Sequence, residues 1–230
     1  MVDTHKLAVR LVMIDLDGTI AHSAPDIAAS ANRMLEALGL EPHPLELVES
    51  FIGNGVPKLI ERALTGDRDG VPDPELFEKA RPIFERYYAE HVCELTKPYP
   101  GAVEGIAALK DAGYRVVCIT NKAEAFTVPL LRALGVAERF DLILSGDSLP
   151  KKKPDPMPLL HACERFQVEL DDAVFVGDSI HDLHAARNAG VRAILVPYGY
   201  NHGLDVRTAG AHAVVDSLLG LRDLLTLKSA

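Results

Sequence analysis

Cysteine is scarce in this sequence of 230 residues, and long apolar runs are missing. The three cysteines, Cys93, Cys118 and Cys163, are odd in number and widely spaced, and Cys118 lies inside an apolar run. This pattern argues against a disulfide scaffold and for reduced, mainly structural thiols. No apolar run approaches the ~20 residues of a membrane span, and Met1 to Lys6 lacks the apolar core of a signal peptide. We therefore expect a soluble, cytoplasmic protein that does not bind membranes.

Long basic runs are absent as well. The chain has 24 Lys and Arg against 33 Asp and Glu, a net charge of −9, and no basic run longer than Lys151-Lys152-Lys153. This balance argues against a broad surface for nucleic acid or anionic lipid. Any anionic substrate must therefore be met locally, by a few side chains. The length allows one or two domains and a sizeable core.

Short apolar, β-branched runs recur along the chain, and helix-like segments separate those after residue 100. Between Gly101 and Gly113, apolar residues keep helical spacing, and the second glycine ends the helix before the next strand. This alternation predicts an α/β fold with a Rossmann-like, doubly wound parallel sheet as its core. The expected strands are Leu11 to Ile14, Arg115 to Ile119, Leu142 to Leu144, Ala173 to Val176 and Ala193 to Val196.

The interval from Ala21 to about Lys97 has a different pattern. Its apolar residues keep helical spacing, prolines punctuate it, and it contains no strand-like run. We interpret residues 21–96 as an α-helical insertion. The core would then be discontinuous, with residues 1–20 and 97–230 forming one domain.

Two acids stand directly after the first expected strand. Asp15 and Asp17 follow the apolar run that ends at Ile14, and Gly18 provides a tight turn behind them. Open α/β sheets bind ligands at the carboxyl edge of their strands. Two carboxylates at that edge require a metal ion, a lysine or protonation to neutralise them.

Three other segments place polar groups at the same edge. Thr120-Asn121 offers a hydroxyl and backbone N–H groups that suit a phosphate oxygen, and Lys153 precedes Pro154, which restricts it to an extended conformation. Each segment alone has an ordinary explanation as a cap, a turn or a solvated lysine. The remaining polar residues, Asp178, Ser179 and Asp182, follow the strand that ends at Val176.

Taken together, these segments favour a site for phosphoryl transfer. The three acids Asp15, Asp17 and Asp178 would repel one another without compensation. An oxygen-ligated Mg²⁺ together with Lys153 would stabilise them and prepare the cluster for a phosphoryl group. Catalysis of this kind consists mostly of positioning and charge neutralisation.

The four segments, in their order, resemble the motifs of the haloacid dehalogenase-like phosphohydrolases. The resemblance implies that Asp15 is the nucleophile that forms an aspartyl-phosphate, and that Asp17 protonates the leaving oxygen and then activates water. It also implies that the Asp15 carboxylate, the Asp17 carbonyl and Asp178 hold Mg²⁺. Four residues would bind the phosphoryl oxygens: Gly18, Thr120, Asn121 and Lys153. Two residues of the fourth motif, Ser179 and Asp182, would support the metal-bound waters or Lys153.

The resemblance covers essentially the whole chain, and within the family the sequence most resembles the phosphoglycolate phosphatase branch. It implies a helical cap at residues 21–96 that closes over the site, and a small phosphorylated metabolite of carbohydrate metabolism as the substrate. One departure is His22, where the branch usually has an acid before the serine that corresponds to Ser23. The segments that carry the branch are Ile52-Gly53-Asn54-Gly55, Tyr99-Pro100-Gly101, Thr120-Asn121-Lys122, Gly146-Asp147-Ser148-Leu149-Pro150 and Tyr198-Gly199-Tyr200-Asn201.

Weaker signals stay open at this point. The Gly53-Asn54-Gly55 segment is either a loop that faces the substrate or a plain turn, and it lacks the Lys of a nucleotide P-loop. Lys58 and Arg62 would either meet a substrate carboxylate or lie on a solvated helix face. We interpret His181 and His184 as surface histidines, because nothing completes a zinc shell around them.

Several reactions remain compatible with this fold. The main hypothesis is Mg²⁺-dependent hydrolysis of 2-phosphoglycolate, and the alternatives are another small phosphomonoester, a phosphomutase or a phosphonate hydrolase with Lys58 as its amine. Asp17 argues against a dehalogenase, which needs no acid for its leaving group. A phosphate-binding regulator without catalysis would be expected to have lost a charged motif residue, and none is lost. Both a monomer and a homodimer remain possible.

Overall fold

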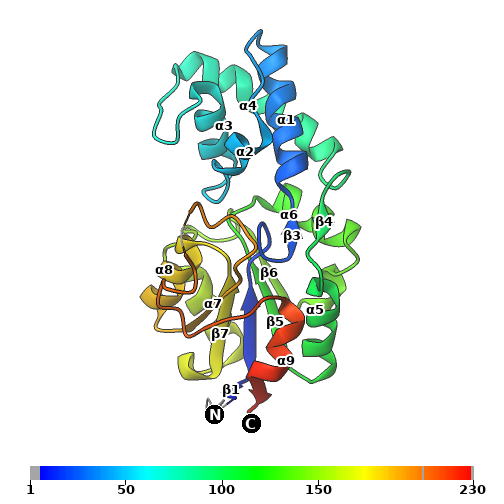
Figure 1. Cartoon of the computed structure of the whole chain (residues 1–230), viewed down its shortest axis with the longest axis vertical. Coiled ribbons are helices and arrows are strands. Elements are labelled where there is room, and N and C mark those ends of the chain that lie inside the picture. The colour runs from blue at the N-terminus through cyan, green and yellow to red at the C-terminus, as the bar shows by residue number, and fades with distance from the viewer. Residues whose placement is uncertain (1–5, 204, 229–230) are drawn as a thin grey trace.

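The core of the protein is a six-stranded parallel sheet with the strand order β6-β5-β2-β7-β8-β9 (Figure 1). The computed structural model describes residues 6–203 and 205–228. All five strands expected from the sequence are present. The fourth ends one residue later than expected, and the fifth begins and ends one residue earlier. The α/β class with a doubly wound parallel sheet is therefore confirmed. The strands are β2 (Leu11–Ile14), β5 (Arg115–Ile119), β6 (Leu142–Leu144), β7 (Ala173–Gly177), β8 (Arg192–Leu195) and β9 (Ala213–Val214).

Helices cover both faces of the sheet, and the side chains of β2 alternate between two hydrophobic clusters. Val12 and Ile14 belong to one cluster, and Leu11 and Met13 belong to the other. All four residues are completely buried, which explains why this central strand reads as a continuous apolar run. The core helices are α5 (Ala102–Asp111), α6 (Glu124–Ala133), α7 (Met157–Phe166), α8 (Ile180–Ala189) and α9 (Leu221–Leu224).

Local sequence signals begin and end the helices of the core. Helix α5 ends before Gly113, whose φ of 92° suits glycine and turns the chain into β5. Helix α8 begins with a capping box, in which Ser179 and Asp182 each accept a hydrogen bond from the backbone of the other. The fourth expected motif therefore stands at the junction between β7 and α8.

The interval between β2 and β5 is helical, with one correction to the sequence prediction. Its helices are α1 (Ala24–Ala37), α2 (Leu45–Glu49), α3 (Val56–Thr65) and α4 (Pro74–Glu90). They pack together above the carboxyl edge of the sheet (Figure 1). However, the prediction that the interval from Ala21 to about Lys97 contains no strand is wrong. Strands β3 (Ala21–His22) and β4 (Lys97–Pro98) pair antiparallel where the chain enters and leaves the helices.

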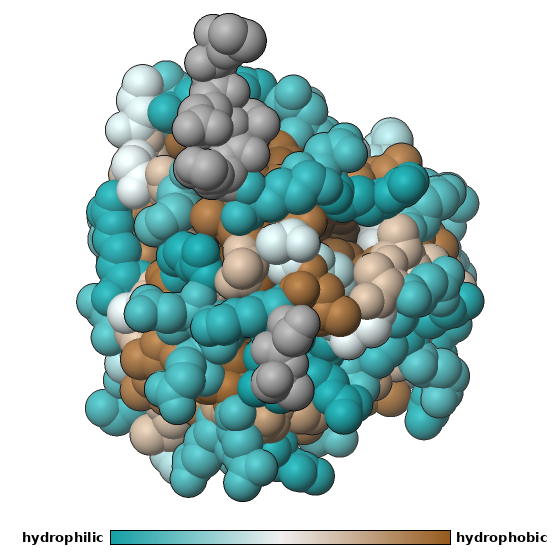
Figure 2. Space-filling model, turned by 90° about the horizontal axis from the view of Figure 1, so that it is seen from below, coloured by the Kyte–Doolittle hydropathy of each residue, from teal (hydrophilic) through white to brown (hydrophobic). Residues whose placement is uncertain are grey.

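The opposite end of the core is closed by a second pair of short strands that the sequence did not predict. Strand β1 (Leu7–Val9) pairs in parallel with β10 (Leu225–Leu227). Seen from this end, the surface is mostly hydrophilic, with apolar side chains interspersed among polar ones (Figure 2). In the part of the chain that the structure describes, none of the helices combines the length and hydropathy needed to cross a lipid bilayer.

The three cysteines are free thiols, as the sequence suggested. Cys118 and Cys163 are buried, and burial raises the pKa of the Cys163 thiol to about 11. A buried thiol that stays protonated is a poor nucleophile. These two cysteines therefore serve the packing of the core.

Candidate active site

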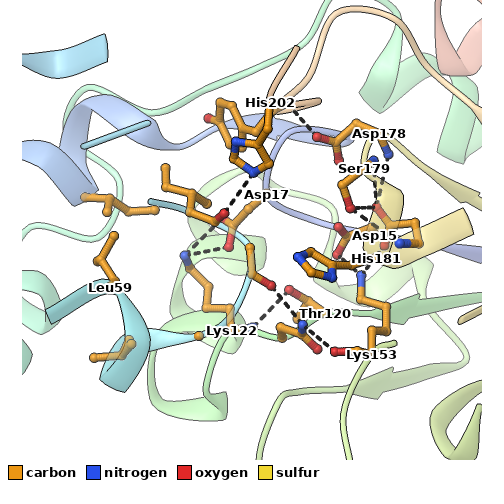
Figure 3. A pocket seen from close by; sticks show the side chains of 18 of the residues that line it. Asp15, Asp17, Leu59, Thr120, Lys122, Lys153, Asp178, Ser179, His181 and His202 are labelled. Atoms are coloured by element: carbon orange, nitrogen blue, oxygen red, sulfur yellow. Dashed lines mark hydrogen bonds and ion pairs between the residues drawn. The ribbon is translucent and has the colours of Figure 1, made fainter. Parts of the chain in front are cut away.

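A cavity lies between the carboxyl edge of the sheet and the helices of the insertion (Figure 3). Asp15 reaches it from the end of β2, Thr120 from the end of β5 and Asp178 from the end of β7, while Lys153 comes from the loop after β6. Neighbouring parallel strands all end at one edge of a sheet, so residues distant in sequence converge there. The structure thus brings the four expected motifs together around one cavity.

Lys153 lies between two of the acids. Its Nζ is 2.7 Å from Asp15 Oδ1 and 2.7 Å from Asp182 Oδ1, and the residue is only 3% exposed. Burial opposes a charged ammonium, but the two carboxylates outweigh it and raise the pKa of Lys153 above its ordinary value. Lys153 therefore stays cationic and can attract a phosphoryl oxygen.

Asp182 orients this lysine from the first turn of α8. Its Oδ2 accepts hydrogen bonds from Ser179 Oγ at 2.6 Å and from the Ser179 N–H at 3.0 Å, which leaves Oδ1 for Lys153. Burial alone favours the neutral acid, but Lys153 and Ser179 hold the pKa of Asp182 below its ordinary value. Of the two roles expected for Asp182, contact with Lys153 is thus present in the structure.

Asp15 and Asp178 form an acidic pair with less compensation. Ligand oxygens of Asp15, Asp178 and Asp182 lie within 4.8 Å of one another, and all three residues are buried. Burial, opposed by Lys153, raises the pKa of Asp15 to about 7, and burial with the neighbouring acids raises the pKa of Asp178 well above its ordinary value. The site therefore holds more buried carboxyl groups than Lys153 can compensate, and a cation at the expected position would favour their ionised form.

The donor set of this pair fits a hard divalent cation. The candidate ligands are all oxygens, which is the preference of Mg²⁺. Asp15 Oδ1 lies 2.7 Å from the Lys153 ammonium, but it receives no well-aligned hydrogen bond from any residue that the structure describes. Two hydrogen bonds hold Asp178 in place, one from Thr19 Oγ1 at 2.8 Å and one from the Tyr200 N–H at 2.5 Å.

Gly18 is required by the close approach of these groups. Its φ is +87°, and a Cβ at this position would lie 2.3 Å from Asp178 Oδ2. Any other residue would therefore displace the Asp178 carboxylate as well as strain the turn. The structure explains why glycine follows Asp17, whereas contact of Gly18 with phosphate stays a prediction.

Asp17 is paired with a lysine to which the sequence analysis gave no role. Lys122 Nζ lies 3.0 Å from each oxygen of Asp17, and Ser23 Oγ donates to Asp17 Oδ1 at 2.6 Å. Lys122 is buried and also lies over the ring of Tyr88, 4.8 Å from its centroid. Lys122 did stand in one of the family-like segments, but that segment could not show that it reaches an acid in another loop.

Asn121 lies at the site, but its side chain has a different task from the one expected of a phosphate ligand. Its Nδ2 donates to the carbonyls of Gly53 at 2.8 Å and Lys153 at 3.0 Å. The Thr120 hydroxyl accepts a hydrogen bond from the Lys122 N–H at 3.2 Å. Phosphate binding by Thr120 and by the Asn121 backbone therefore stays a prediction. The Asn121 side-chain amide connects Gly53 of the insertion to the loop that carries Lys153.

The loop between α2 and α3 is attached to the core by several such contacts. Besides Asn121, His202 Nε2 shares a hydrogen bond with the Ile52 carbonyl at 3.1 Å, and Lys152 Nζ donates to the Asn54 carbonyl at 2.8 Å. His181 Nε2 lies 3.3 Å from Asn54 Nδ2. Gly53 and Gly55 both line the cavity, so this loop faces the site rather than forming a plain surface turn.

The structure also shows the contacts of Arg62, Lys58 and His22, whose roles the sequence left open. Arg62 is buried and donates to the carbonyls of Phe51 and Arg68, so neither a solvated face nor a role as a free cation describes it. Lys58 pairs with Glu61 at 2.7 Å. His22 shares a hydrogen bond with the Tyr200 hydroxyl at 3.1 Å, beside the β3–β4 pair.

The cavity has two chemically different ends. Its volume is about 50 Å³. The sheet contributes the acids and Lys153, whereas the insertion contributes a mostly apolar roof. The roof residues are Ile27, Ile52, Val56, Leu59, Phe84 and Tyr88. Such a site can neutralise a phosphoryl group at one end and exclude water at the other.

Comparison with known proteins supports this interpretation. The family model described as haloacid dehalogenase-like hydrolase matches residues 12–196. The phosphoglycolate phosphatase of Nitrosospira multiformis is 52% identical over 223 residues, which are 97% of this chain and 98% of that protein. The enzyme of the same name from Thiobacillus denitrificans is 50% identical over 212 residues, or 92% and 93% of the two chains.

Solved structures agree with the sequence relatives. A protein described as a predicted phosphoglycolate phosphatase from Haemophilus somnus superimposes with a TM-score of 0.88 at 32% identity, covering 94% of this chain and 97% of its own. The CbbY protein of Rhodobacter sphaeroides, solved in complex with phosphate, gives a TM-score of 0.77 at 29% identity, covering 93% and 96%. With its motifs assembled around one cavity and relatives along nearly its whole length, the chain belongs to the haloacid dehalogenase-like hydrolase family, as its sequence led us to expect.

Proposed function

We propose that this protein hydrolyses 2-phosphoglycolate to glycolate and phosphate through an aspartyl-phosphate on Asp15. The observation that carries the proposal is the position of Asp15, with the Lys153 ammonium and the Asp178 carboxylate beside it, in a cavity that the helical insertion covers. The named substrate rests on the relatives called phosphoglycolate phosphatase, which are similar to nearly the whole chain.

Mg²⁺ is the cofactor that we propose for this site. The carboxylates of Asp15 and Asp178 and the backbone carbonyl of Asp17 would hold it. When bound, it would neutralise the acids and draw charge from the phosphoryl oxygens. The uncompensated acidic pair and its all-oxygen donor set support this assignment.

The chain's own residues would perform the reaction in two steps. First, an Asp15 oxygen forms a bond to phosphorus while the bond from phosphorus to the leaving oxygen breaks, and Asp17 gives its proton to that oxygen. Lys153 and Thr120 hold the phosphoryl oxygens. Then the Asp17 carboxylate takes a proton from water, the water oxygen bonds to phosphorus, and the Asp15–phosphorus bond breaks to release phosphate.

The helical insertion would act as a cap in this scheme. We propose that residues 21–96 form the cap domain and that residues 1–20 and 97–230 form the core domain, with the β3–β4 pair at the junction. The roof of the cavity comes from the insertion, so closure would exclude water from the phosphorylated aspartate. Lys58 pairs with Glu61, which offers no support for a Schiff-base role in a phosphonate hydrolase.

A substrate panel with a matched variant tests the proposal. Purified protein with Mg²⁺ should hydrolyse 2-phosphoglycolate faster than unrelated small phosphomonoesters and a sugar bisphosphate. Asp15→Asn should lower kcat by more than about 1000-fold without unfolding the chain. Asp155→Asn makes the same change at a surface acid paired with Lys151, and should leave the rate unchanged. Equal rates across the panel would refute the substrate, and an active Asp15→Asn variant would refute the nucleophile.

Metal binding can be tested without turnover. Mg²⁺ should raise the Tm of the wild-type protein, because a ligand that binds only the folded state stabilises it. Asp178→Asn should abolish that shift. If the variant and the wild type respond equally to Mg²⁺, Asp178 is not a metal ligand.

A further inference from the structure

The roof of the cavity contains one polar group that the fold leaves unpaired. Tyr88, on α4, is 1% exposed and lines the cavity, but its hydroxyl has no hydrogen-bond partner among the residues that the structure describes. A buried hydroxyl without a partner is unfavourable, and such groups are rare in folded proteins. Phenylalanine would fill the same space without this penalty, so the presence of the hydroxyl indicates that it binds a ligand.

Lys122 provides a second donor beside it. The ammonium lies 4.8 Å from the centre of the Tyr88 ring and 3.0 Å from each oxygen of Asp17. A lysine ammonium has three N–H donors, and Asp17 accepts two of them. One donor from Lys122 and the hydroxyl of Tyr88 therefore remain available in the same cavity, and together they suit the two oxygens of a carboxylate.

The distribution of charge places this pair away from the phosphoryl end. Lys122 and Lys153 are the lysines among the described residues that line the cavity, and Lys153 is held by Asp15 and Asp182. Lys122 instead stands between Asp17 and the apolar roof. A substrate with a second anionic group, bound with its phosphate at Asp15, would find its compensating charge at Lys122.

We propose that Tyr88 Oη and Lys122 Nζ together bind the carboxylate of the leaving group, and so select a phosphorylated hydroxy acid over a phosphomonoester whose leaving group carries no charge. This inference rests on the proposed phosphatase function. Because Lys122 would touch both Asp17 and the carboxylate, it would also bring the leaving oxygen close to the acid. Burial raises the pKa of Tyr88 well above its ordinary value, so the hydroxyl stays a donor.

The competing interpretation is structural. In that view, Lys122 is only the counter-ion of Asp17, and Tyr88 only packs against Phe84 and Phe126. Tyr88→Phe separates the two interpretations, because it keeps the ring and removes the hydroxyl alone. A purely structural Tyr88 would show the same small change with every substrate.

The test compares 2-phosphoglycolate with ethyl phosphate, which has a methyl group in place of the carboxylate. For 2-phosphoglycolate, Tyr88→Phe and Lys122→Met should each lower kcat/KM by about 10- to 100-fold, the range of a hydrogen bond to a charged group. For ethyl phosphate, Tyr88→Phe should change kcat/KM by less than about 3-fold. Lys122→Met also disturbs Asp17, so its loss with ethyl phosphate should be present but smaller.

Matched controls come from neighbouring residues. Tyr87→Phe removes a hydroxyl from the next residue of α4, which lines a different cleft with Ser30 and His91. Lys58→Met removes a lysine that pairs with Glu61. Neither variant should alter the preference for 2-phosphoglycolate over ethyl phosphate. If both Tyr88→Phe and Lys122→Met keep the wild-type preference, the proposed carboxylate pocket is wrong.

A binding experiment separates this inference from the proposed function. In the Asp15→Asn protein, calorimetry should show that 2-phosphoglycolate binds at least about 10-fold more tightly than ethyl phosphate, and that adding Tyr88→Phe removes most of the difference. Loss of selectivity in binding supports the pocket even if turnover of 2-phosphoglycolate is slow. Equal binding of both ligands by Asp15→Asn overturns it, whatever the phosphatase activity.

Discussion

Asp26 and Thr96 lie 70 positions apart and are joined through a single carboxylate oxygen. Asp26 Oδ2 accepts hydrogen bonds from the Thr96 N–H at 2.8 Å and from Thr96 Oγ1 at 2.6 Å. The same carboxylate also accepts from the N–H groups of Glu94 and Leu95. Asp26 stands in the first turn of α1, so one buried side chain ties together the segments that enter and leave the helical insertion.

Replacing Asp26 by Asn should therefore destabilise the protein strongly. The amide keeps one acceptor oxygen but turns an NH₂ group towards N–H donors, so several charge-assisted hydrogen bonds are lost. We expect the free energy of unfolding in urea to fall by about 2–4 kcal/mol. Thr96→Val removes only one donor and should cost about 1 kcal/mol. Equal losses in the two variants would show that the carboxylate is not the centre of this junction.

Gly18→Ala should abolish activity for a steric reason. The added Cβ would lie 2.3 Å from Asp178 Oδ2, so the carboxylate must move. Gly39→Ala is the matched control, because Gly39 also has a positive φ, of +73°, but open space around it. It should cost about 1 kcal/mol of stability and leave kcat unchanged. Retention of full activity in Gly18→Ala would show that the turn can relax without moving Asp178.

Acid should remove a stabilising contribution from Asp141. Burial would raise its pKa, but Lys110 at 2.7 Å, the Val116 N–H and Arg115 together hold the pKa of Asp141 below its ordinary value. The contribution should be complete above about pH 5 and disappear as the pH falls below about 4. Asp141→Asn should cost about 1 kcal/mol at pH 7, and the difference from wild type should shrink at pH 3. Denaturation curves at both pH values measure this, and a difference independent of pH would contradict it.

Tyr88→Phe should raise stability while it lowers activity. The substitution removes a buried hydroxyl that has no partner among the described residues, so the free energy of unfolding should rise by up to about 1–2 kcal/mol. Thermal unfolding without ligand checks this outcome. A decrease in Tm would mean that the hydroxyl already has a favourable partner in the unliganded protein.

Removing Lys153 should harm both the fold and the reaction. Without the ammonium, Asp15 and Asp182 face each other uncompensated in a buried site, and Lys153→Met should lower stability by about 3–5 kcal/mol. Lys151→Met, at an exposed lysine in the same loop, should change stability by less than about 0.5 kcal/mol. If the two variants unfold at the same urea concentration, Lys153 does not neutralise the acids.

Much of the fold could be predicted because the core strands are buried on both faces. Runs such as Leu11 to Ile14 are apolar throughout, and this signal needs no knowledge of the partner strand. Strands β3 and β4 were missed because each has only two residues and is defined by its pairing. The convergence of Asp15, Thr120, Lys153 and Asp178 could be foreseen, since parallel strands share one carboxyl edge.

The residues whose roles could not be predicted act through side-chain contacts that the local sequence does not show. Lys122 and Ser23 meet at Asp17, and nothing in their local sequence shows where their side chains point. Arg62 was expected either on a solvated helix face or at a substrate carboxylate, but it is buried because two backbone carbonyls accept its N–H groups. Periodicity identifies which residues are helical, whereas such pairings depend on how the helices pack.

The position of β2 at the centre of the sheet also bears on how the chain folds during synthesis. The two strands that pair with it, β5 and β7, begin at Arg115 and Ala173. The ribosome therefore makes β2 long before either of its partner strands. The helices at residues 24–90 are all made in the interval before β5, and they pack mainly on one another. Until β5 and β7 have been synthesised, the apolar strand Leu11 to Ile14 has no pairing partner. Incomplete chains whose synthesis stops at that stage should therefore be the most prone to aggregate.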